Sequence, residues 1–272
     1  MLREETVRLL EKHSITLETQ LDEQQLVDLG VIERLIESAE VNPGDTALDI
    51  GAGLGNITVS LAGSARRVYA VEKNPKFLPA LRERTAGLGN VVIVHGDALY
   101  IGFPPFTKIA SNLPYAICEP LNQRLLPLQF ERASLIVPES YARTLTAYPD
   151  DQGYTKLTLV ANAFFRIRHI EDIEPEVYLP PPRITTSILT LEPRGAEGRS
   201  EDILRRVILQ ADKKLKNALR EALIGSSQTF DAPETKREAN AVIGSMGIGH
   251  TILEKRVSRL SLADLKKVSG CL

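Results

Sequence analysis

The sequence has little of what a secreted, membrane-spanning or metal-binding protein needs. Its only cysteines, Cys118 and Cys271, lie far apart in different contexts, so neither a disulfide scaffold nor a cysteine-based zinc site is expected. The four histidines have no ligand-like spacing, and we predict no metal site. No apolar run approaches the ~20 residues of a membrane span, and residues 1–13 are amphipathic and acidic, unlike a secretory signal. We therefore expect a cytoplasmic protein.

Positive charge is also scarce, unlike in most proteins that bind nucleic acid. The 272 residues include 33 Lys and Arg against 35 Asp and Glu, which gives a net charge of -2 and a pI of about 6.2. Proteins that make many phosphate contacts are usually more basic, at least locally. Hydrophobic residues at 43% and charged residues at 25% exclude disorder or a fibrous repeat as the main character.

Short apolar runs alternate with helical patterns after the turn signal "NPGD" at residues 42–45. The predicted strands are 46–51, 67–72, 90–98, 108–113, 133–138, 159–171 and 186–193, and the predicted helices between them include 56–65 and 75–87. This alternation predicts βαβ units and a mostly parallel sheet covered by helices on both faces. The alternating character of 186–193 suits an antiparallel edge, so we expect a mixed, Rossmann-like α/β sheet.

The two ends of the chain have helical patterns of their own. Residues 3–15 and 31–41 have apolar residues at helical spacing, which predicts a helical N-terminal extension over residues 1–44. From about Gly195 the sequence becomes polar, helical and rich in Lys and Arg. We predict one α/β domain over residues 1–194 and a small all-helical domain over residues 195–272.

A glycine loop follows the first predicted strand of the sheet. In "GAGLGN" the glycines Gly51, Gly53 and Gly55 permit a tight turn, a close approach of a ligand and close packing of the next helix. The next strand ends in Glu72, about 20 residues later, where a carboxylate can accept both hydroxyls of a ribose. A third strand ends in "HGDAL", where Asp97 could receive an adenine amino group. These features predict a nucleoside cofactor.

Two ligands compete for this loop. A dinucleotide needs G-x-G-x-x-G with its pyrophosphate on the helix N-terminus, but the third glycine comes one residue early here. The carboxylate of Asp49 would repel a pyrophosphate yet could bind an amino-acid ammonium, which S-adenosylmethionine (SAM) has. SAM is therefore favoured. In the alternative interpretation the glycines only make a sharp turn, and Asp97 only caps a helix.

The stretch "SNLPYAICEPL", residues 111–121, follows another strand end. The adenine amino group is a poor nucleophile, and acceptors aimed at its N–H bonds stabilise the transition state of methyl transfer. The Asn112 side-chain carbonyl and the Leu113 backbone carbonyl are such acceptors, and Pro114 stiffens the loop. Tyr115 offers a stacking face worth ~1–3 kcal/mol. The alternative is an ordinary proline turn with a buried tyrosine.

Taken in order, these motifs resemble the KsgA-type ribosomal RNA adenine dimethyltransferases, particularly the archaeal and eukaryotic branch, over nearly the whole chain. "LDIGAGLGNIT" is similar to the family's L-E-I-G-x-G-x-G-x-L-T, "VYAVEKN" and "HGDAL" to its second and third cofactor motifs, and "SNLPYAICEPL" to its catalytic N-[IL]-P-Y segment. "YLPPPRITTSILTLEP" resembles its F-x-P-P-P-K-V-x-S segment, and "ADKKLKNAL" the basic start of its helical domain.

The resemblance implies a SAM-dependent enzyme that adds two methyl groups to the N6 of each of two adjacent adenines in small-subunit rRNA, with the helical domain assisting the RNA contact. The implied catalytic residues are Asn112, Leu113, Pro114, Tyr115 and Tyr178, the last facing the loop across the target pocket. The implied cofactor-binding residues are Glu23, Leu26, Asp49, Gly51, Gly53, Glu72, Lys73, Asp97, Ala98 and Asn112.

Several positions depart from the family pattern. The N-terminal G-Q-H/N-F-L-x-D appears as "DEQQLVD", so that Glu23 replaces a cofactor-contacting Gln and Gln25 replaces an aromatic. Asp49 stands where the family has Glu. The run before the N-terminal motif, "TLETQL", has no positive charge, whereas "VPESYAR" keeps Glu139 and Arg143. These changes leave the cofactor pocket largely intact and weaken the RNA-facing side.

Three hypotheses follow. The first is the family activity on rRNA, and the second is a diverged methyltransferase that acts on another RNA, a protein or a small molecule. The third is a non-catalytic ribosome-assembly factor, against which the intact catalytic residues argue. The low pI argues against assuming the first, although the basic segment 205–220 recovers part of an RNA-binding footprint.

Overall fold

The computed structural model describes residues 1–272, which form two compact units. Unit 1 comprises Met1–Thr146 and Arg166–Pro193, and unit 2 comprises Ala147–Phe165 and Arg194–Leu272. The sequence placed residues 147–165 in the first domain, but in the structure they belong to unit 2. Leu159 and Val160 of this segment pack against the apolar core of the C-terminal helices, which explains the difference.

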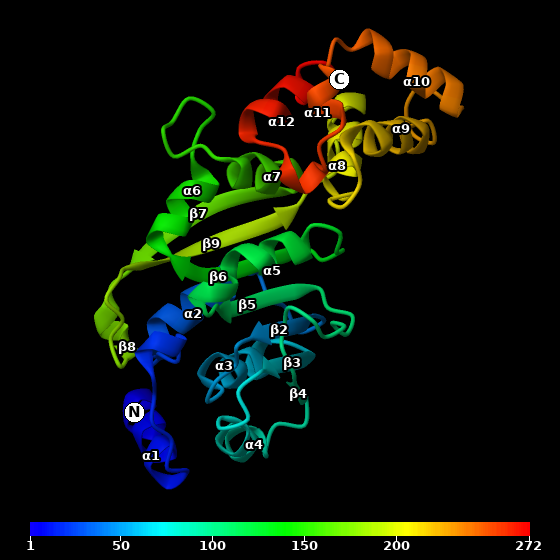
Figure 1. The fold of residues 1–272 in the computed structure, drawn as a ribbon. Helices are drawn as coiled ribbons and strands as arrows, with labels where there is room; N and C mark the ends of the chain where they lie inside the picture. Colours follow the sequence, from blue (N-terminus) through cyan, green and yellow to red (C-terminus); the bar gives the residue numbers. More distant parts are fainter. The chain divides into compact units, whose positions relative to one another are not determined.

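Unit 1 is built on a seven-stranded mixed sheet, as expected (Figure 1). The strand order is β4-β3-β2-β5-β6-β9-β7, and β6 pairs antiparallel with β9 while the pairs among β2 to β6 are parallel. The strands are β2 Thr46–Ile50, β3 Arg67–Glu72, β4 Val91–His95, β5 Lys108–Asn112, β6 Arg132–Pro138, β7 Phe165–Ile173 and β9 Thr186–Pro193. The Rossmann-like α/β class is therefore confirmed.

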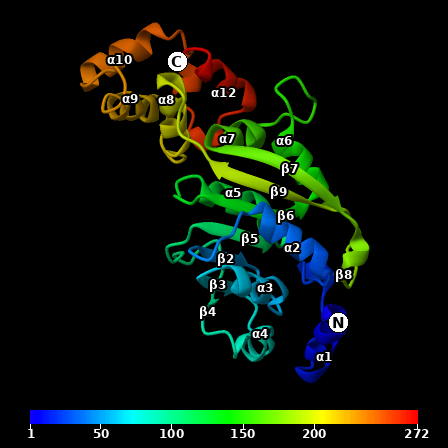
Figure 2. The ribbon, with the colours of Figure 1, turned by 180° about the vertical axis from the view of Figure 1, so that it is seen from behind.

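Helices cover both faces of this sheet. Figure 1 shows α5 and α6 in front of the strands, and Figure 2 shows α2 and α3 in front of the opposite face. The helices of unit 1 are α1 Leu2–Lys12, α2 Leu29–Ser38, α3 Asn56–Ser64, α4 Leu78–Thr85, α5 Cys118–Leu125 and α6 Glu139–Thr146, with short 3-10 turns at Thr19–Leu21, Tyr115–Ile117 and Pro175–Val177. Apolar side chains of α2 and α3, such as Ile32, Leu35 and Leu61, are fully buried in the core.

The predicted strand over 159–171 is wrong in its first half. Helix α7, Lys156–Phe164, occupies that part, and β7 begins only at Phe165. Thr155 caps this helix, because its hydroxyl accepts a hydrogen bond from Thr158 N while Thr158 Oγ1 accepts one from Thr155 N. The apolar run "LVANAFF" continues through both elements, and hydrophobicity alone does not separate a buried helix from a buried strand.

The C-terminal segment of unit 2 is helical, as the sequence predicts. Its further helices are α8 Arg199–Ile208, α9 Leu215–Ser226, α10 Lys236–Ser245, α11 His250–Leu253 and α12 Leu262–Ser269, with a 3-10 turn at Val257–Arg259. They share one apolar core that includes Val207, Leu219 and Val268, all fully buried. No helix of the chain has both the length and the apolar character to cross a membrane.

The fold brings two loops of unit 1 together at one edge of the sheet. Strand β2 pairs with β3 on one side and with β5 on the other, so the chain order reverses at β2. Open α/β sheets bind ligands outside the carboxyl ends of the strands at such a reversal. The glycine loop follows β2, and Asn112 ends β5, so both predicted motifs lie at this position.

Candidate functional site

The glycine loop lets two other segments approach its backbone closely. Gly51 and Gly53 have φ values of 75° and 55°, which side chains rarely adopt. A Cβ at Gly51 would lie 2.9 Å from Pro114 Cδ, and one at Gly53 would lie 2.6 Å from Gln25 Oε1. The glycines thus join the loop after β2 to the Asn112 loop and to the N-terminal motif.

A cavity of about 530 Å³ lies beside this loop. Its size is within the range of about 300–1,000 Å³ that is usual for small-ligand sites. All the residues assigned to the cofactor from the sequence, except Asp49, line it: Glu23, Leu26, Gly51, Gly53, Glu72, Lys73, Asp97, Ala98 and Asn112. The structure therefore gathers side chains from four separate motifs around one space.

Glu72 is fixed by two backbone donors at the end of β3. Its Oε2 accepts a hydrogen bond from Gly53 N at 2.7 Å, and its Oε1 accepts one from Asn74 N at 2.6 Å. Burial raises the pKa of this carboxyl group, and the backbone donors oppose the shift. Each oxygen keeps a second lone pair, so the carboxylate can still accept hydrogen bonds from a ligand in the cavity.

Asp49 does not line the cavity, and its contact with the cofactor stays a prediction. Its side chain is buried below the glycine loop, and its Oδ2 accepts a hydrogen bond from the Thr58 hydroxyl of α3 at 2.6 Å. Burial raises its pKa to about 7, with the Thr58 hydrogen bond opposing the shift and the charge of Glu72 adding to it. The shorter side chain of Asp relative to Glu agrees with this withdrawn position.

Asp97 combines a structural role with a place in the cavity wall. Its Oδ1 accepts a hydrogen bond from Leu99 N at 2.9 Å, which fixes a turn between β4 and β5. No helix begins here, so the alternative role as a helix cap is not observed. Its other oxygen lies 2.8 Å from Lys73 Nζ, and this hydrogen bond, with that of Leu99, lowers the pKa of Asp97. The carboxylate is thereby kept ionised.

Sequence reasoning missed a residue that supports the Asp97 loop. The Arg124 guanidinium of α5 donates to the backbone carbonyls of Ala98 and Ile101, and it lies 4.5 Å from the centre of the Phe103 ring. Helix α5 directly follows the Asn112 loop, so this arginine connects two walls of the cavity. A single Arg in a helical pattern gives no sequence signal for such a role.

The Asn112 loop carries an unsatisfied polar atom. Asn112 Oδ1 is buried and has no hydrogen-bond partner, and Asn112 lines the cavity. The loop around it is fixed, because Leu113 N donates to Ile136 O at 3.1 Å and Pro114 packs on Gly51. Tyr115 is half-buried, and burial, with a contribution from the charge of Asp22, raises its pKa to about 12.

Tyr178 is a buried residue whose pKa is raised mainly by burial, with a further contribution from Tyr115 of the Asn112 loop. It belongs to β8, Tyr178–Leu179, which pairs antiparallel with β1, Gln25–Leu26, in a small separate sheet. The side chain is 0% exposed within the apolar core, and its hydroxyl shares a 2.7 Å hydrogen bond with Thr186 Oγ1. Tyr178 does not line the cavity, and its role across the target pocket stays a prediction.

Three side chains of the altered N-terminal motif bind other segments of the site. Gln25 Oε1 accepts a hydrogen bond from Leu54 N at 3.1 Å, and Asp22 Oδ2 accepts one from Ala116 N at 3.1 Å. Glu23 pairs with Lys76. The departure from the family pattern at residues 22–25 is the sequence signal that marks them, but their partners could not be read from it.

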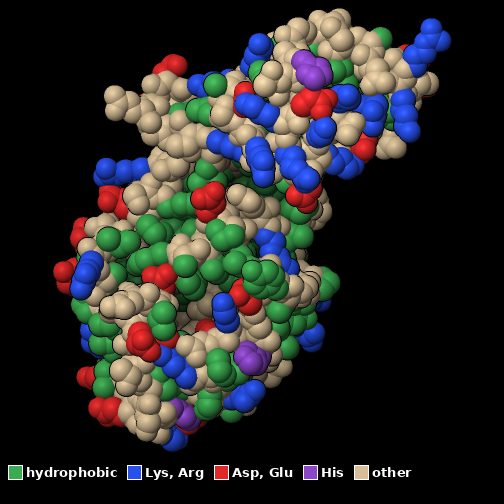
Figure 3. All heavy atoms as spheres, viewed as in Figure 1, with side chains coloured by type: hydrophobic (Ala, Val, Ile, Leu, Met, Phe, Trp, Pro, Cys, Tyr) green, Lys and Arg blue, Asp and Glu red, His purple; other side chains and the backbone are tan.

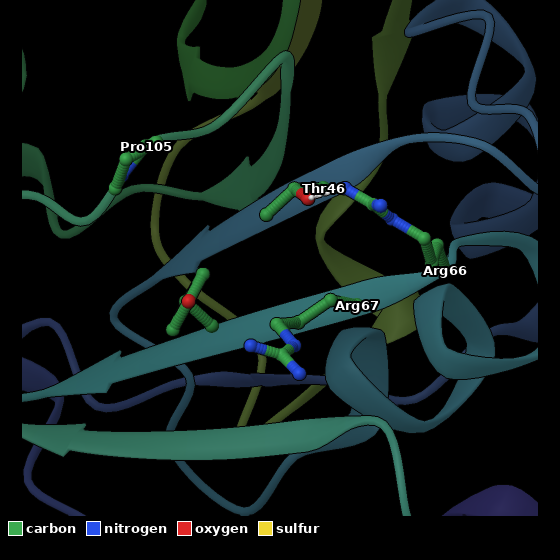
Figure 4. A pocket seen from close by; sticks show the side chains of 5 residues that line it. Thr46, Arg66, Arg67 and Pro105 are labelled. Carbon is green, nitrogen blue, oxygen red and sulfur yellow. Dashed lines mark hydrogen bonds between the residues drawn. The ribbon is translucent and has the colours of Figure 1, made fainter.

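A second hollow, of about 320 Å³, lies at the opposite end of the strands (Figure 4). It is lined by Thr46, Arg66, Arg67, Tyr69 and Pro105. Arg66 Nη2 lies 3.4 Å from Thr46 Oγ1. Thr46 is the first residue of β2, and Arg66 directly precedes β3. None of the residues assigned from the sequence lines it, so it is separate from the candidate site.

Comparison with known proteins identifies the relatives of this chain. The family model "Ribosomal RNA adenine dimethylase" matches residues 15–248. A protein named "Probable ribosomal RNA small subunit methyltransferase A" from Methanothermobacter thermautotrophicus is 32% identical over 267 residues, which cover 97% of this chain and 94% of the relative. The protein of the same name from Thermococcus kodakarensis is 33% identical over 272 residues, with 98% and 94% covered.

Two solved structures have the same fold. A dimethyladenosine transferase from Plasmodium falciparum superposes with a TM-score of 0.61 at 23% identity, covering 89% of this chain and 94% of that one. The 23S rRNA methyltransferase ErmE superposes with a TM-score of 0.60 at 22% identity, covering 91% and 98%. Together with the family match and the archaeal relatives, the order of motifs around the cavity shows that this chain belongs to the ribosomal RNA adenine dimethylase family.

Proposed function

We propose that the protein transfers methyl groups from SAM to the exocyclic N6 of adenines in small-subunit rRNA. The observation that carries this proposal is the Asn112 side chain, whose Oδ1 is buried without a partner at the cavity wall. A buried acceptor left unsatisfied costs about 1–3 kcal/mol. An adenine amino group placed at this wall would supply the missing donor.

The charge of the cavity fits SAM better than a phosphate-bearing cofactor. The charged side chains that line it are Asp22, Glu23, Glu72, Asp97 and Lys73, four acidic and one basic. Such a wall repels a pyrophosphate and accommodates the sulfonium and ammonium groups of SAM. Glu72 would hold the ribose hydroxyls, and Asp97 the adenine of the cofactor. When bound there, SAM supplies the methyl group.

The loop residues would prepare the target nitrogen for attack. Asn112 Oδ1 accepts a hydrogen bond from the N6 amino group and stabilises the charge that develops on this nitrogen. Leu113 and Pro114 hold the loop in place, through Ile136 O and Gly51 respectively. With a pKa of about 12, Tyr115 remains a neutral phenol and offers its ring as a stacking face rather than acting as a base.

The division of charge between the two units supports RNA as the partner. Unit 2 holds 16 Lys and Arg against 12 Asp and Glu, for a net charge of +4, whereas unit 1 holds 17 against 23, for -6. Figure 3 shows Lys and Arg side chains gathered over the C-terminal helices. The overall charge of -2 therefore conceals a basic unit, which answers the objection raised by the low pI.

Part of this charge forms a basic ridge, by which we mean Lys213, Lys214, Lys216, Arg256 and Arg259. The two segments of the ridge meet because Lys214 and Arg256 form a β-bridge and Val257 N donates to Lys213 O at 2.9 Å. Glu254 pairs with Lys214 and Lys216. Arg256 and Arg259 have no ion pair and are exposed, so they remain available for phosphates.

Methyl transfer from labelled SAM tests the proposal. The protein is incubated with SAM and unmethylated small ribosomal subunits, and in parallel with total cell extract. We expect label in small-subunit rRNA. Label in another RNA, a protein or a small molecule would replace this substrate by a different one, and SAM binding without any transfer would remove the catalytic assignment. A cytoplasmic site of action is part of the same proposal, since it follows from the ribosomal substrate.

A further inference from the structure

A short segment closes one side of the cofactor cavity. We call residues 18–26 the strap. Seven consecutive residues of the strap, 20–26, line the cavity. Apart from the pairing of Gln25 and Leu26 with β8, the strap has no regular strand or helix longer than the 3-10 turn Thr19–Leu21. Its position therefore depends on side-chain contacts with the segments it crosses.

One of these contacts is an ion pair. Glu23 Oε2 lies 2.6 Å from Lys76 Nζ and accepts a second hydrogen bond from Glu18 N at 2.7 Å. Glu23 Oε1 accepts one from Asn74 Nδ2 at 2.9 Å. Asn74 and Lys76 follow β3 and are not part of the strap. The pair thus ties the strap to the segment that also fixes Glu72.

Glu23 and Lys76 differ in how many other charged or polar partners each has. The Glu23 side chain is 5% exposed, and Lys76 is its only cationic partner. The Lys76 side chain is 28% exposed, donates also to Thr16 O at 3.0 Å and lies 3.9 Å from Glu18. Removing Lys76 therefore leaves a buried charge uncompensated, which is strongly destabilising, whereas removing the charge of Glu23 leaves a lysine with other partners.

The pair also sits between the two other ties of the strap. On one side of Glu23, Asp22 Oδ2 accepts the hydrogen bond of Ala116 N in the Asn112 loop. On the other side, Gln25 bonds Leu54 N of the glycine loop and donates to Glu23 O at 2.9 Å. The ion pair therefore lies between the two contacts that join the strap to the functional loops.

We propose that Glu23 and Lys76 form a clasp that holds the strap closed against the cofactor cavity, which makes Lys76 a positioning residue for SAM although it does not line the cavity. The proposal rests on the proposed function in taking SAM as the ligand of this cavity. It also explains how the chain accommodates Glu where the family pattern has a neutral Gln: Lys76 compensates the charge of Glu23.

Equilibrium binding of SAM to the full chain tests the clasp, with calorimetry on the wild type and four variants. We expect Lys76→Met to weaken SAM binding by about tenfold or more, because it leaves Glu23 buried and unpaired. Glu23→Gln keeps an amide oxygen that can accept from Lys76 but loses the charge, so we expect an affinity between those of the wild type and Lys76→Met. The double variant Glu23→Gln/Lys76→Met leaves no uncompensated charge and should bind better than Lys76→Met alone. Lys76→Arg keeps the pair and the affinity.

The matched control is Lys12→Met. In the wild type, Lys12 Nζ lies 2.6 Å from Glu83 Oε1, and the two side chains are 60% and 39% exposed. Neither residue lines the cavity. This variant should leave SAM affinity unchanged. In turnover, Lys76→Met should raise KM for SAM while kcat at saturating SAM stays the same. Hydrogen exchange of the Leu54 and Ala116 amides should rise in Lys76→Met and return in the double variant.

The outcomes separate the clasp from the proposed function. Wild-type affinity in Lys76→Met, or a double variant as weak as Lys76→Met, overturns the clasp while the methyltransferase stands. A wild type that binds no SAM overturns the proposed function, and the clasp is then decided by whether Lys76→Met raises exchange at Leu54 and Ala116. Equal exchange in wild type and Lys76→Met rejects it.

Discussion

Asn112 is the residue on which the proposed chemistry depends most directly. Its Oδ1 is the one buried side-chain acceptor of the cavity wall that lacks a partner. Donors and acceptors held in place before the reaction stabilise developing charge at little reorganisation cost, and removing one typically costs about 100-fold or more in rate. In the proposed mechanism the amide therefore serves the reaction rather than the stability of the loop.

We expect Asn112→Ala to lower the rate of methyl transfer by at least about 100-fold, with SAM affinity within about threefold of wild type. Asn112→Asp keeps an acceptor oxygen and should retain more activity than the alanine variant. Single-turnover transfer and SAM binding are measured on the same preparations. Unchanged turnover in Asn112→Ala would remove this residue from the mechanism.

Asp49 predicts a pH dependence of stability. Its pKa rises from 3.8 to about 7 on folding, mainly through burial. Between these values the folded state holds a proton that the unfolded chain has released, so this group stabilises the fold fully below pH 3.8 and progressively less as pH rises towards 7.

In Asp49→Asn this loss is absent, and the amide oxygen can still accept from Thr58. The free energy of unfolding of the variant relative to wild type should therefore increase by about 2 kcal/mol from pH 5 to pH 8. Urea denaturation at the two pH values measures it. A difference that does not vary with pH would show that Asp49 is ionised in the folded protein.

At the scale of single residues, the sequence predicted those whose role follows from type and spacing. Glu72 and Asn112 end strands at the carboxyl edge, and such positions can be counted from the glycine loop. The burial of Tyr178 and Asp49 could not be predicted, because it depends on packing between elements distant in sequence. The partners of Glu23 and Arg124 were not predictable for the same reason.

Among the elements, the glycine loop gives a direct test. Gly53→Ala places a Cβ 2.6 Å from Gln25 Oε1 at a φ of 55°. Gln25 must move, which breaks its bond to Leu54 N, and the backbone strain adds about 1–2 kcal/mol. We expect lower thermal stability and weaker SAM binding. Wild-type behaviour in this variant would contradict the described contact between strap and loop.

Gly63→Ala in α3 is the matched control for this substitution. Its Cβ would meet nothing within 4 Å, and Ala favours helix over Gly by about 0.5–1 kcal/mol. This variant should be slightly more stable than wild type and bind SAM normally. The pair therefore separates a local contact from a general effect of added side chains.

Elements with a clear hydrophobic period were predicted well. The strands β2, β3 and β5 and the helices α3 and α4 lie where alternation and turn signals placed them. The error at α7 arose because an apolar run of helix and strand together has no period of its own. Strand β1, two residues long, forms only by pairing with β8 and has no local signal.

For the whole molecule, the division of charge predicts which unit dominates RNA affinity. Arg256→Gln/Arg259→Gln removes two exposed cations of the basic ridge. We expect weaker binding to small-subunit rRNA and a slope of log K against log salt that is shallower by about 1–2. Arg8→Gln/Arg82→Gln removes two exposed cations from the acidic unit 1 and should change neither. Equal effects of both pairs would contradict the assignment.

The central claim is that this chain methylates adenine N6 in small-subunit rRNA through Asn112. The most direct measurement is nucleoside mass spectrometry of small-subunit rRNA after incubation of unmethylated subunits with SAM and either the wild type or Asn112→Ala. The account predicts N6-methylated adenosines with the wild type and none above background with the variant. Unmodified adenosines with a wild type that binds SAM, or equal methylation by both proteins, would contradict it.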